Sequence, residues 1–208
     1  MASPANRKPI MTLFSGSDPH SHRTRIVLFE KEVEFQVVEV DEQKKPRELS
    51  DHNPYNEVPT MIDRDLVLYS SPIINEYLDE RLPHPPLMPV DPVSRAKARL
   101  MLYRFDRDWY SLTPIIEGDD KKLASKAANT IRDGLTVISP VFKERPFILG
   151  EEFSLVDCAL APILWRLDKY GISMPRQARP VLEYAERLFA RKSFRKSLLD
   201  TEREMRQA

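Results

Sequence analysis

The chain has 208 residues, and its 32 Lys and Arg side chains balance its 32 Asp and Glu side chains, so the formal net charge at neutral pH is zero. This balance argues against broad electrostatic binding to nucleic acid or to an anionic membrane, and no apolar run approaches the ~20 residues that a membrane-spanning helix needs. The single cysteine, Cys158, excludes an intramolecular disulfide framework and a Cys-x-x-Cys redox or zinc site. We therefore expect a soluble cytoplasmic protein.

The first third of the chain predicts alternating strands and helices. Runs rich in β-branched and aromatic residues predict four strands, at residues 11–14, 35–40, 60–63 and 66–69. Arg64-Asp65 separates the last two strands, which are therefore expected to form a hairpin. Helices are expected from a cap at Ser21 to about Lys31, over residues 46–49, and from a cap at Ser71 with Pro72 at the first helical position. The resulting β-α-β-α-β-β-α order is thioredoxin-like.

A proline-rich segment follows the last of these helices. Residues 83–92 contain five prolines and one histidine, His84, but no glycine. Each proline fixes φ and lacks an amide donor, so the segment is expected to lie as a stiff, extended strip on the surface. A stiff strip loses little conformational entropy when a partner docks on it. The alternative interpretation is a rigid linker between domains.

The second half of the chain predicts helices alone. Apolar residues recur at spacings of three and four along one expected long helix: Leu102, Phe105, Trp109, Leu112 and Ile116. Further helices are expected over residues 121–142, from a cap at Ser154, and over residues 181–190. We therefore expect an α/β thioredoxin-like domain at residues 9–84, a proline-rich strip or linker at 85–92, and an all-α domain at 93–205.

Three local motifs resemble those of the glutathione transferase superfamily. Val58-Pro59, before a strand, is similar to its cis-proline turn, which pairs with the cysteinyl part of glutathione. Ser70-Ser71 stands where the superfamily has a Glu-Ser pair that holds the glutamyl carboxylate. Ser154 and Asp157 resemble the capping box of the buried helix in its second domain. The resemblance implies a thioredoxin-like N-terminal domain followed by an all-helical C-terminal domain.

Longer segments narrow this resemblance to the stringent starvation protein A family of bacterial regulators. They lie at residues 76–90, 107–110, 153–158, 161–167 and 201–206. The resemblance implies a homodimer that binds the sigma subunit of RNA polymerase holoenzyme through a surface pocket formed by Pro83, His84, Pro85 and Pro86. We expect no cofactor, no membrane association and no direct sequence-specific contact with nucleic acid. Asp91 departs from the family, whose members carry an aromatic residue at this position.

The residues expected at a transferase active site do not favour catalysis. The position that supplies the thiolate-stabilising group in related classes, five residues before the first Arg of Arg23-Thr24-Arg25, is Asp18. A carboxylate there would repel the thiolate that it should stabilise. Ser70 also replaces the carboxylate that would meet the ammonium group of glutathione. We therefore expect no enzyme activity. The alternative is a glutathione-binding protein or transferase that uses one of the nearby hydroxyls, Ser15, Ser17 or Ser21.

Two histidine patterns also suggest chemistry. Asp18, His20 and His22 alternate, as zinc ligands on an extended segment do. The fold places a loop and a helix start there, so we expect the three side chains to diverge and predict no metal site. His84, by contrast, lies between two prolines and is expected to present its imidazole from a fixed backbone. Leu87 and Met88 follow it as apolar anchors or as a plug between the domains.

Overall fold

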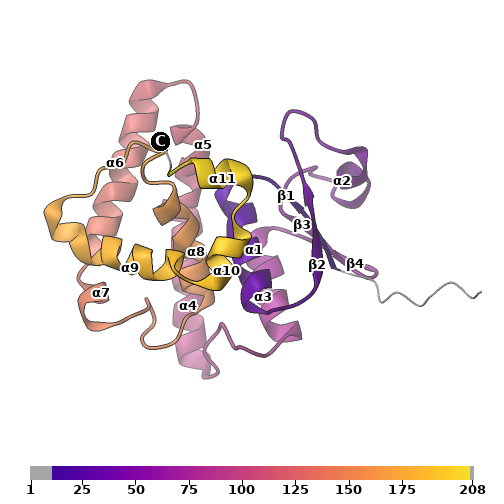
Figure 1. Cartoon of the computed structure of the whole chain (residues 1–208), viewed down its shortest axis with the longest axis horizontal. Helices are drawn as coiled ribbons and strands as arrows, with labels where there is room; N and C mark the ends of the chain where they lie inside the picture. Colours follow the sequence, from indigo (N-terminus) through magenta and orange to yellow (C-terminus); the bar gives the residue numbers. More distant parts are fainter. Residues whose placement is uncertain (1–10, 207–208) are drawn as a thin grey trace, which may run out of the picture.

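The computed structural model describes residues 11–206 and places a four-stranded sheet beside a bundle of helices (Figure 1). The strands are β1 (Met11–Ser15), β2 (Phe35–Glu39), β3 (Thr60–Asp63) and β4 (Leu66–Tyr69). Their order is β2-β1-β3-β4, in which β1 pairs parallel with β2 and antiparallel with β3, and β3 pairs antiparallel with β4. The expected hairpin and the thioredoxin-like strand order are thereby confirmed.

Helices cover both faces of the sheet. They are α1 (Pro19–Glu30), α2 (Arg47–His52) and α3 (Ser71–Arg81). In Figure 1, α1 and α3 lie between the sheet and the helical domain, while α2 lies beyond the sheet. The buried faces of α1 and α3 join one apolar core with the helical domain, whereas Leu49 of α2 packs with Phe14 and Val40 in a separate small cluster. Because α1 is buried between the sheet and the bundle, its residues can reach both domains.

The second half is helical, with shorter elements than its pattern predicts. The α-helices are α4 (Pro92–Asp108), α5 (Thr113–Ile116), α6 (Lys121–Ile138), α7 (Val141–Glu144), α8 (Leu155–Trp165), α9 (Arg179–Phe189), α10 (Lys192–Ser197) and α11 (Asp200–Glu204). Within residues 82–206, the one β-type pairing is an isolated bridge between Phe147 and Gly150. Within residues 11–206, each helix is too short or too polar to cross a bilayer.

Two expected long helices are wrong because a proline interrupts each of them. The helix expected to run through Ile116 ends at Asp108, and Trp109 leaves helical geometry with φ −127° and ψ −50°. Pro114 lacks an amide donor and its ring would clash with the preceding turn, so the chain restarts as α5. Pro140 likewise separates α6 from α7. The helical spacing of apolar residues continues across both breaks, so the pattern alone predicts one continuous helix in each case.

Two expected caps are also wrong. Helix α1 begins at Pro19, and Asp18 is its cap, with the carboxylate Oδ1 accepting the backbone N–H of Ser21 at 2.9 Å. The Ser21 hydroxyl accepts the Gly16 N–H at 3.1 Å instead. Helix α3 begins at Ser71, and Ser70 occupies its cap position with φ +72°. Short apolar and polar runs near the C-terminus form α10 and α11, which the sequence pattern did not predict.

Candidate functional site

One buried lysine, Lys31, bonds to the backbone of the proline-rich strip. Lys31 follows the last residue of α1, and its ammonium group donates to Asp79 Oδ1 at 2.6 Å, to the Leu82 carbonyl at 2.7 Å and to the Pro85 carbonyl at 2.6 Å. The lysine side chain is 0% exposed and that of Asp79 is 5% exposed. The backbone on both sides of His84 is therefore fixed to the core of the N-terminal domain.

Leu87 ties the far end of the strip to both domains. Its backbone N–H donates to Asp79 Oδ1 at 2.8 Å, and its carbonyl accepts the Leu155 N–H at the start of α8 at 2.8 Å. The side chains of Leu87 and Met88 are buried in the core that the domains share. These two residues thus plug the domain interface, which was one of their two expected roles.

The residues before Leu87 leave their side chains in solvent. Pro83, His84, Pro85 and Pro86 are all exposed. The His84–Pro85 peptide bond is cis, so the expectation of one continuously extended strip is wrong at this point. The chain bends at His84 and Pro85, and the four exposed side chains lie in the connection between α3 and α4.

A hollow of about 770 Å³ opens beside Pro85 and Pro86. One wall is residues 85–91 of the strip, and the opposite walls come from α4 and from residues 145–154. Its lining is largely apolar and includes Met88, Met101, Phe147 and Phe153. Its volume lies within the range of ~300–1,000 Å³ that is typical of ligand and peptide sites. Exposed proline side chains and an apolar hollow therefore adjoin on one face.

The region that corresponds to a glutathione site is filled by internal bonds. The Val58–Pro59 bond is cis, as in the resembling turn. The Ser71 hydroxyl accepts the Arg23 Nε–H at 2.8 Å and contacts His20 Nδ1 at 3.1 Å. Arg23 also pairs with Asp106 of α4 at 2.6 Å. The groups that would receive a carboxylate are engaged with one another.

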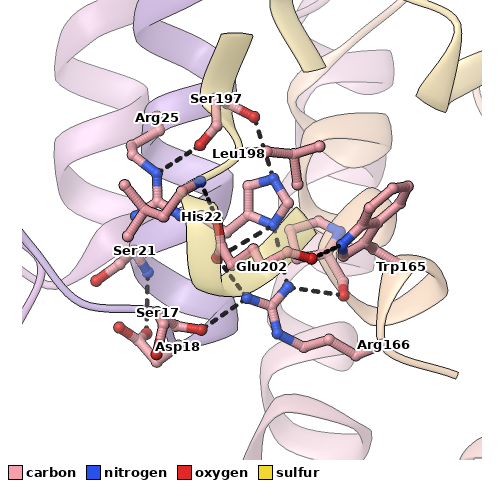
Figure 2. Close-up of polar contacts among 12 residues, drawn as sticks. Ser17, Asp18, Ser21, His22, Arg25, Trp165, Arg166, Ser197, Leu198 and Glu202 are labelled. Atoms are coloured by element: carbon pink, nitrogen blue, oxygen red, sulfur yellow. Dashed lines mark hydrogen bonds and ion pairs between the residues drawn. The ribbon is translucent and has the colours of Figure 1, made fainter. Parts of the chain in front are cut away.

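A second group of buried charges surrounds Glu202 (Figure 2). Glu202 of α11 pairs with Arg25 of α1 at 2.5 Å and with Arg166, just beyond α8, at 2.5 Å. The Arg166 guanidinium also donates to the Ser17 carbonyl at 2.7 Å, and that of Arg25 donates to the Ser15 hydroxyl. The cluster joins α1, the residue that follows α8, and α11. Sequence analysis missed it, because charged residues in amphipathic patterns are read as solvent-exposed.

The histidines near Asp18 take separate partners. His20 lies against Arg23 and Ser71, whereas His22 contacts the Ser197 hydroxyl at 3.1 Å and Arg166 at 3.0 Å. Burial, and then the nearby Arg23 charge, lowers the pKa of His20 to about 4. Burial also lowers the pKa of His22 well below its usual value, with help from Arg166. Across residues 11–206, no three His, Cys, Asp or Glu side chains gather as metal ligands would.

Asp157 serves the packing of α8. Its carboxylate accepts the backbone N–H and hydroxyl of Ser154 at 2.9 and 2.7 Å, the Ile148 N–H at 3.0 Å and the Tyr184 hydroxyl at 2.6 Å. Burial raises the pKa of Asp157, although these four hydrogen bonds favour the charged form. Burial also raises the pKa of the neighbouring Cys158 thiol, which argues against a reactive thiolate. These groups have structural roles.

Comparisons with known proteins agree with this architecture. Family models described as the glutathione S-transferase N-terminal and C-terminal domains match residues 9–80 and 101–187. The chain is 45% identical over 200 residues to a stringent starvation protein A homolog of Haemophilus influenzae, covering 95% of this chain and 94% of the relative. It is 44% identical to that of Coxiella burnetii, covering 97% of both chains. Glutathione transferase Omega 3C of Trametes versicolor superposes with a TM-score of 0.80 at 26% identity, covering 95% of this chain and 86% of that structure.

Proposed function

Because the chain belongs to the stringent starvation protein A family within the glutathione transferase fold, we propose that it is a transcription regulator that docks on sigma-containing RNA polymerase holoenzyme. The docking surface comprises Pro83, His84, Pro85 and Pro86. The protein acts in the bacterial cytoplasm, without transferase activity, without a cofactor and without direct sequence-specific contact with nucleic acid. Docking changes which promoters or activators the polymerase responds to.

The observation that carries this proposal is the exposure of four side chains on an immobilised backbone. Residues 82–87 are held by Lys31, Asp79 and Leu155, while the side chains from Pro83 to Pro86 remain in solvent. A backbone that is already ordered loses little entropy on binding. The adjoining hollow can receive an apolar side chain of the partner, which is the usual form of an interface anchor.

The absence of catalysis is supported by the arrangement around Asp18. Its carboxylate caps α1 where a transferase would present a hydroxyl or thiol. Two of the three hydroxyls that could replace it are engaged, because Ser15 accepts from Arg25 and Ser21 accepts from the Gly16 N–H, whereas Ser17 is exposed. A glutathione molecule would have to displace Arg23 from Ser71 to place its glutamyl carboxylate there.

The proposed homodimer is supported by an apolar face on α3 and α4. The exposed apolar side chains there are Ile73, Val93, Leu100 and Tyr103. Val93, Leu100 and Tyr103 lie at spacings of seven and three, so they share one side of α4. Light scattering during gel filtration tests this: we expect the mass of two chains, and a monomer after Leu100→Asp/Tyr103→Asp.

The deciding experiment is co-elution with cognate RNA polymerase holoenzyme on gel filtration. The native protein is expected to co-elute, and His84→Ala is expected to elute separately without a change in melting temperature, because His84 is exposed. A titration with glutathione, monitored by calorimetry, is expected to show no saturable binding. The proposal would be contradicted if the native protein failed to bind polymerase, or if it catalysed the transfer of glutathione to an electrophile.

A further inference from the structure

We propose that Lys31 is the positioning residue of the docking surface. Its ammonium group sets the conformation of residues 82–87 and so decides whether Pro83 to Pro86 are presented in a form that a partner can bind. The consequence for binding rests on the proposed function. The effect on the strip itself can be measured without any partner.

The strip cannot hold itself in place. Pro83, Pro85 and Pro86 have no backbone N–H, so between residues 83 and 86 only His84 can donate a main-chain hydrogen bond. The carbonyls of this segment still need donors wherever water is excluded. The carbonyls of this proline-rich segment therefore need donors from other parts of the protein. One side chain with several N–H groups can supply more than one of them.

Lys31 uses all three N–H groups of its ammonium to supply these donors. An ammonium group has three donors and no acceptor, and those of Lys31 meet three oxygens, at Asp79, Leu82 and Pro85. The two carbonyls lie on either side of Pro83 and His84. Fixing both of them to one buried atom restricts the path of the two residues between them.

The same ammonium stabilises the carboxylate that fixes the end of the strip. Asp79 Oδ1 accepts from both Lys31 Nζ and the Leu87 N–H. Both side chains are almost completely buried, so each charge depends on the other. Loss of the lysine would strand the carboxylate and leave the Leu82 and Pro85 carbonyls without a donor.

Lys31 is itself held by the rigid part of the N-terminal domain. It caps the C-terminal end of α1, and its own N–H donates to the Val27 carbonyl at 2.9 Å. Val27 is fully buried, on a helix that contacts both the sheet and the helical domain. The fold thus fixes the ammonium, and the ammonium fixes the strip.

A single and a double variant separate positioning from simple stabilisation. Lys31→Met keeps the length of the side chain and removes every donor. Lys31→Met/Asp79→Asn also removes the stranded charge, while the amide oxygen can still accept from Leu87. The double variant should therefore regain most of the melting temperature lost by the single one. It leaves Leu82 and Pro85 without their donor. Arg23→Met, which breaks the partly buried pair of α1 with Asp106 away from the strip, is the control.

Two readouts are taken on each variant: hydrogen exchange at His84, Leu87 and Met88, and affinity for RNA polymerase holoenzyme. We expect faster exchange at these amides and about tenfold weaker binding in both lysine variants, as when a binding conformation is populated about one tenth of the time. The Arg23→Met protein should bind like the native one.

Each other outcome has a definite meaning. A double variant that binds like the native protein would overturn the inference, because stability alone would then explain the single variant. Unchanged exchange at the strip would overturn it too. If the native protein does not bind polymerase, the proposed function fails, while the exchange data still decide whether Lys31 holds the strip.

Discussion

Two regions of this protein use buried cations in opposite ways. Around Asp18 and Ser71, Arg23 binds Ser71 and Asp106, and Arg25 binds Ser15, Glu202 and the Gly16 and Ser197 carbonyls, so the Ser15 and Ser71 hydroxyls are occupied. Beneath the proline-rich strip, Lys31 binds one carboxylate and two carbonyls, and it leaves the side chains above it free. We call the first the closed region, because its hydroxyls bond to neighbouring side chains. We call the second the open region, because the side chains of Pro83–Pro86 remain exposed.

The proposed function uses this difference to serve binding on a fold that is associated with enzymes. Fold alone does not fix function, since function depends on which groups a site leaves available. At the closed region the Ser15 and Ser71 hydroxyls and the Glu202 carboxylate take part in bonds that link the two domains. At the open region the internal bonds go to the backbone, so rigidity and exposure coexist.

The largest expected effect comes from opening the closed region. Glu202→Ala removes the carboxylate between Arg25 and Arg166, which are both buried, and strands two guanidinium groups. We expect unfolding in urea to show a loss of about 3–5 kcal/mol of stability, as for other broken buried pairs. Polymerase binding by the folded fraction should remain, because the strip is held separately.

Arg203→Ala is the control for this variant. Arg203 lies on the same helix, but its pair with Asp200 is exposed and 3.8 Å long. Such pairs contribute about 0–1 kcal/mol. A Glu202→Ala protein as stable as Arg203→Ala would mean that the cluster does not join the domains.

Acid should weaken the closed region through His20. The pKa of His20 is about 4 in the folded protein, against 6.5 without its surroundings, so the folded state binds fewer protons between these values. Stability is then complete above pH 6.5 and is lost as the pH falls towards 4, by about 1–3 kcal/mol for this group. His20→Gln should lose less stability than the native protein between pH 7 and pH 4.5 in urea titrations. Parallel losses in the two proteins would contradict this assignment.

The open region can be tested by filling its hollow. Met101 of α4 lines the space beside the strip and is partly buried. Met101→Trp should occupy part of that space and weaken polymerase binding about tenfold, or 1.4 kcal/mol, if an apolar side chain of the partner enters it. Leu123→Trp, at an exposed position of α6, is the control. Equal affinities would confine docking to Pro83–Pro86.

Much of the fold follows from local pattern, and the failures have physical causes. Runs rich in β-branched and aromatic residues identify the four strands, Val58-Pro59 marks a turn, and Pro72 marks a helix start. Pro114 and Pro140 break two helices whose apolar spacing continues across them. The pattern does not reveal that Lys31 and Glu202 are buried, because their partners lie far away along the chain. The exposure of Pro83–Pro86 was therefore predictable, and the buried lysine that bonds to their backbone was not.

The smallest expected effect concerns Asp91, where the strip ends and α4 begins. Its carboxylate accepts the Ser94 N–H at 2.8 Å, and this bond lowers the pKa of Asp91. Asp91→Tyr introduces the aromatic residue that the family resemblance implies and removes the cap, so we expect a slightly lower midpoint of urea unfolding. Asp91→Asn keeps a capping oxygen and should be nearly neutral. If Asp91→Tyr binds polymerase more tightly despite its lower stability, an aromatic contact at the edge of the open region adds to docking.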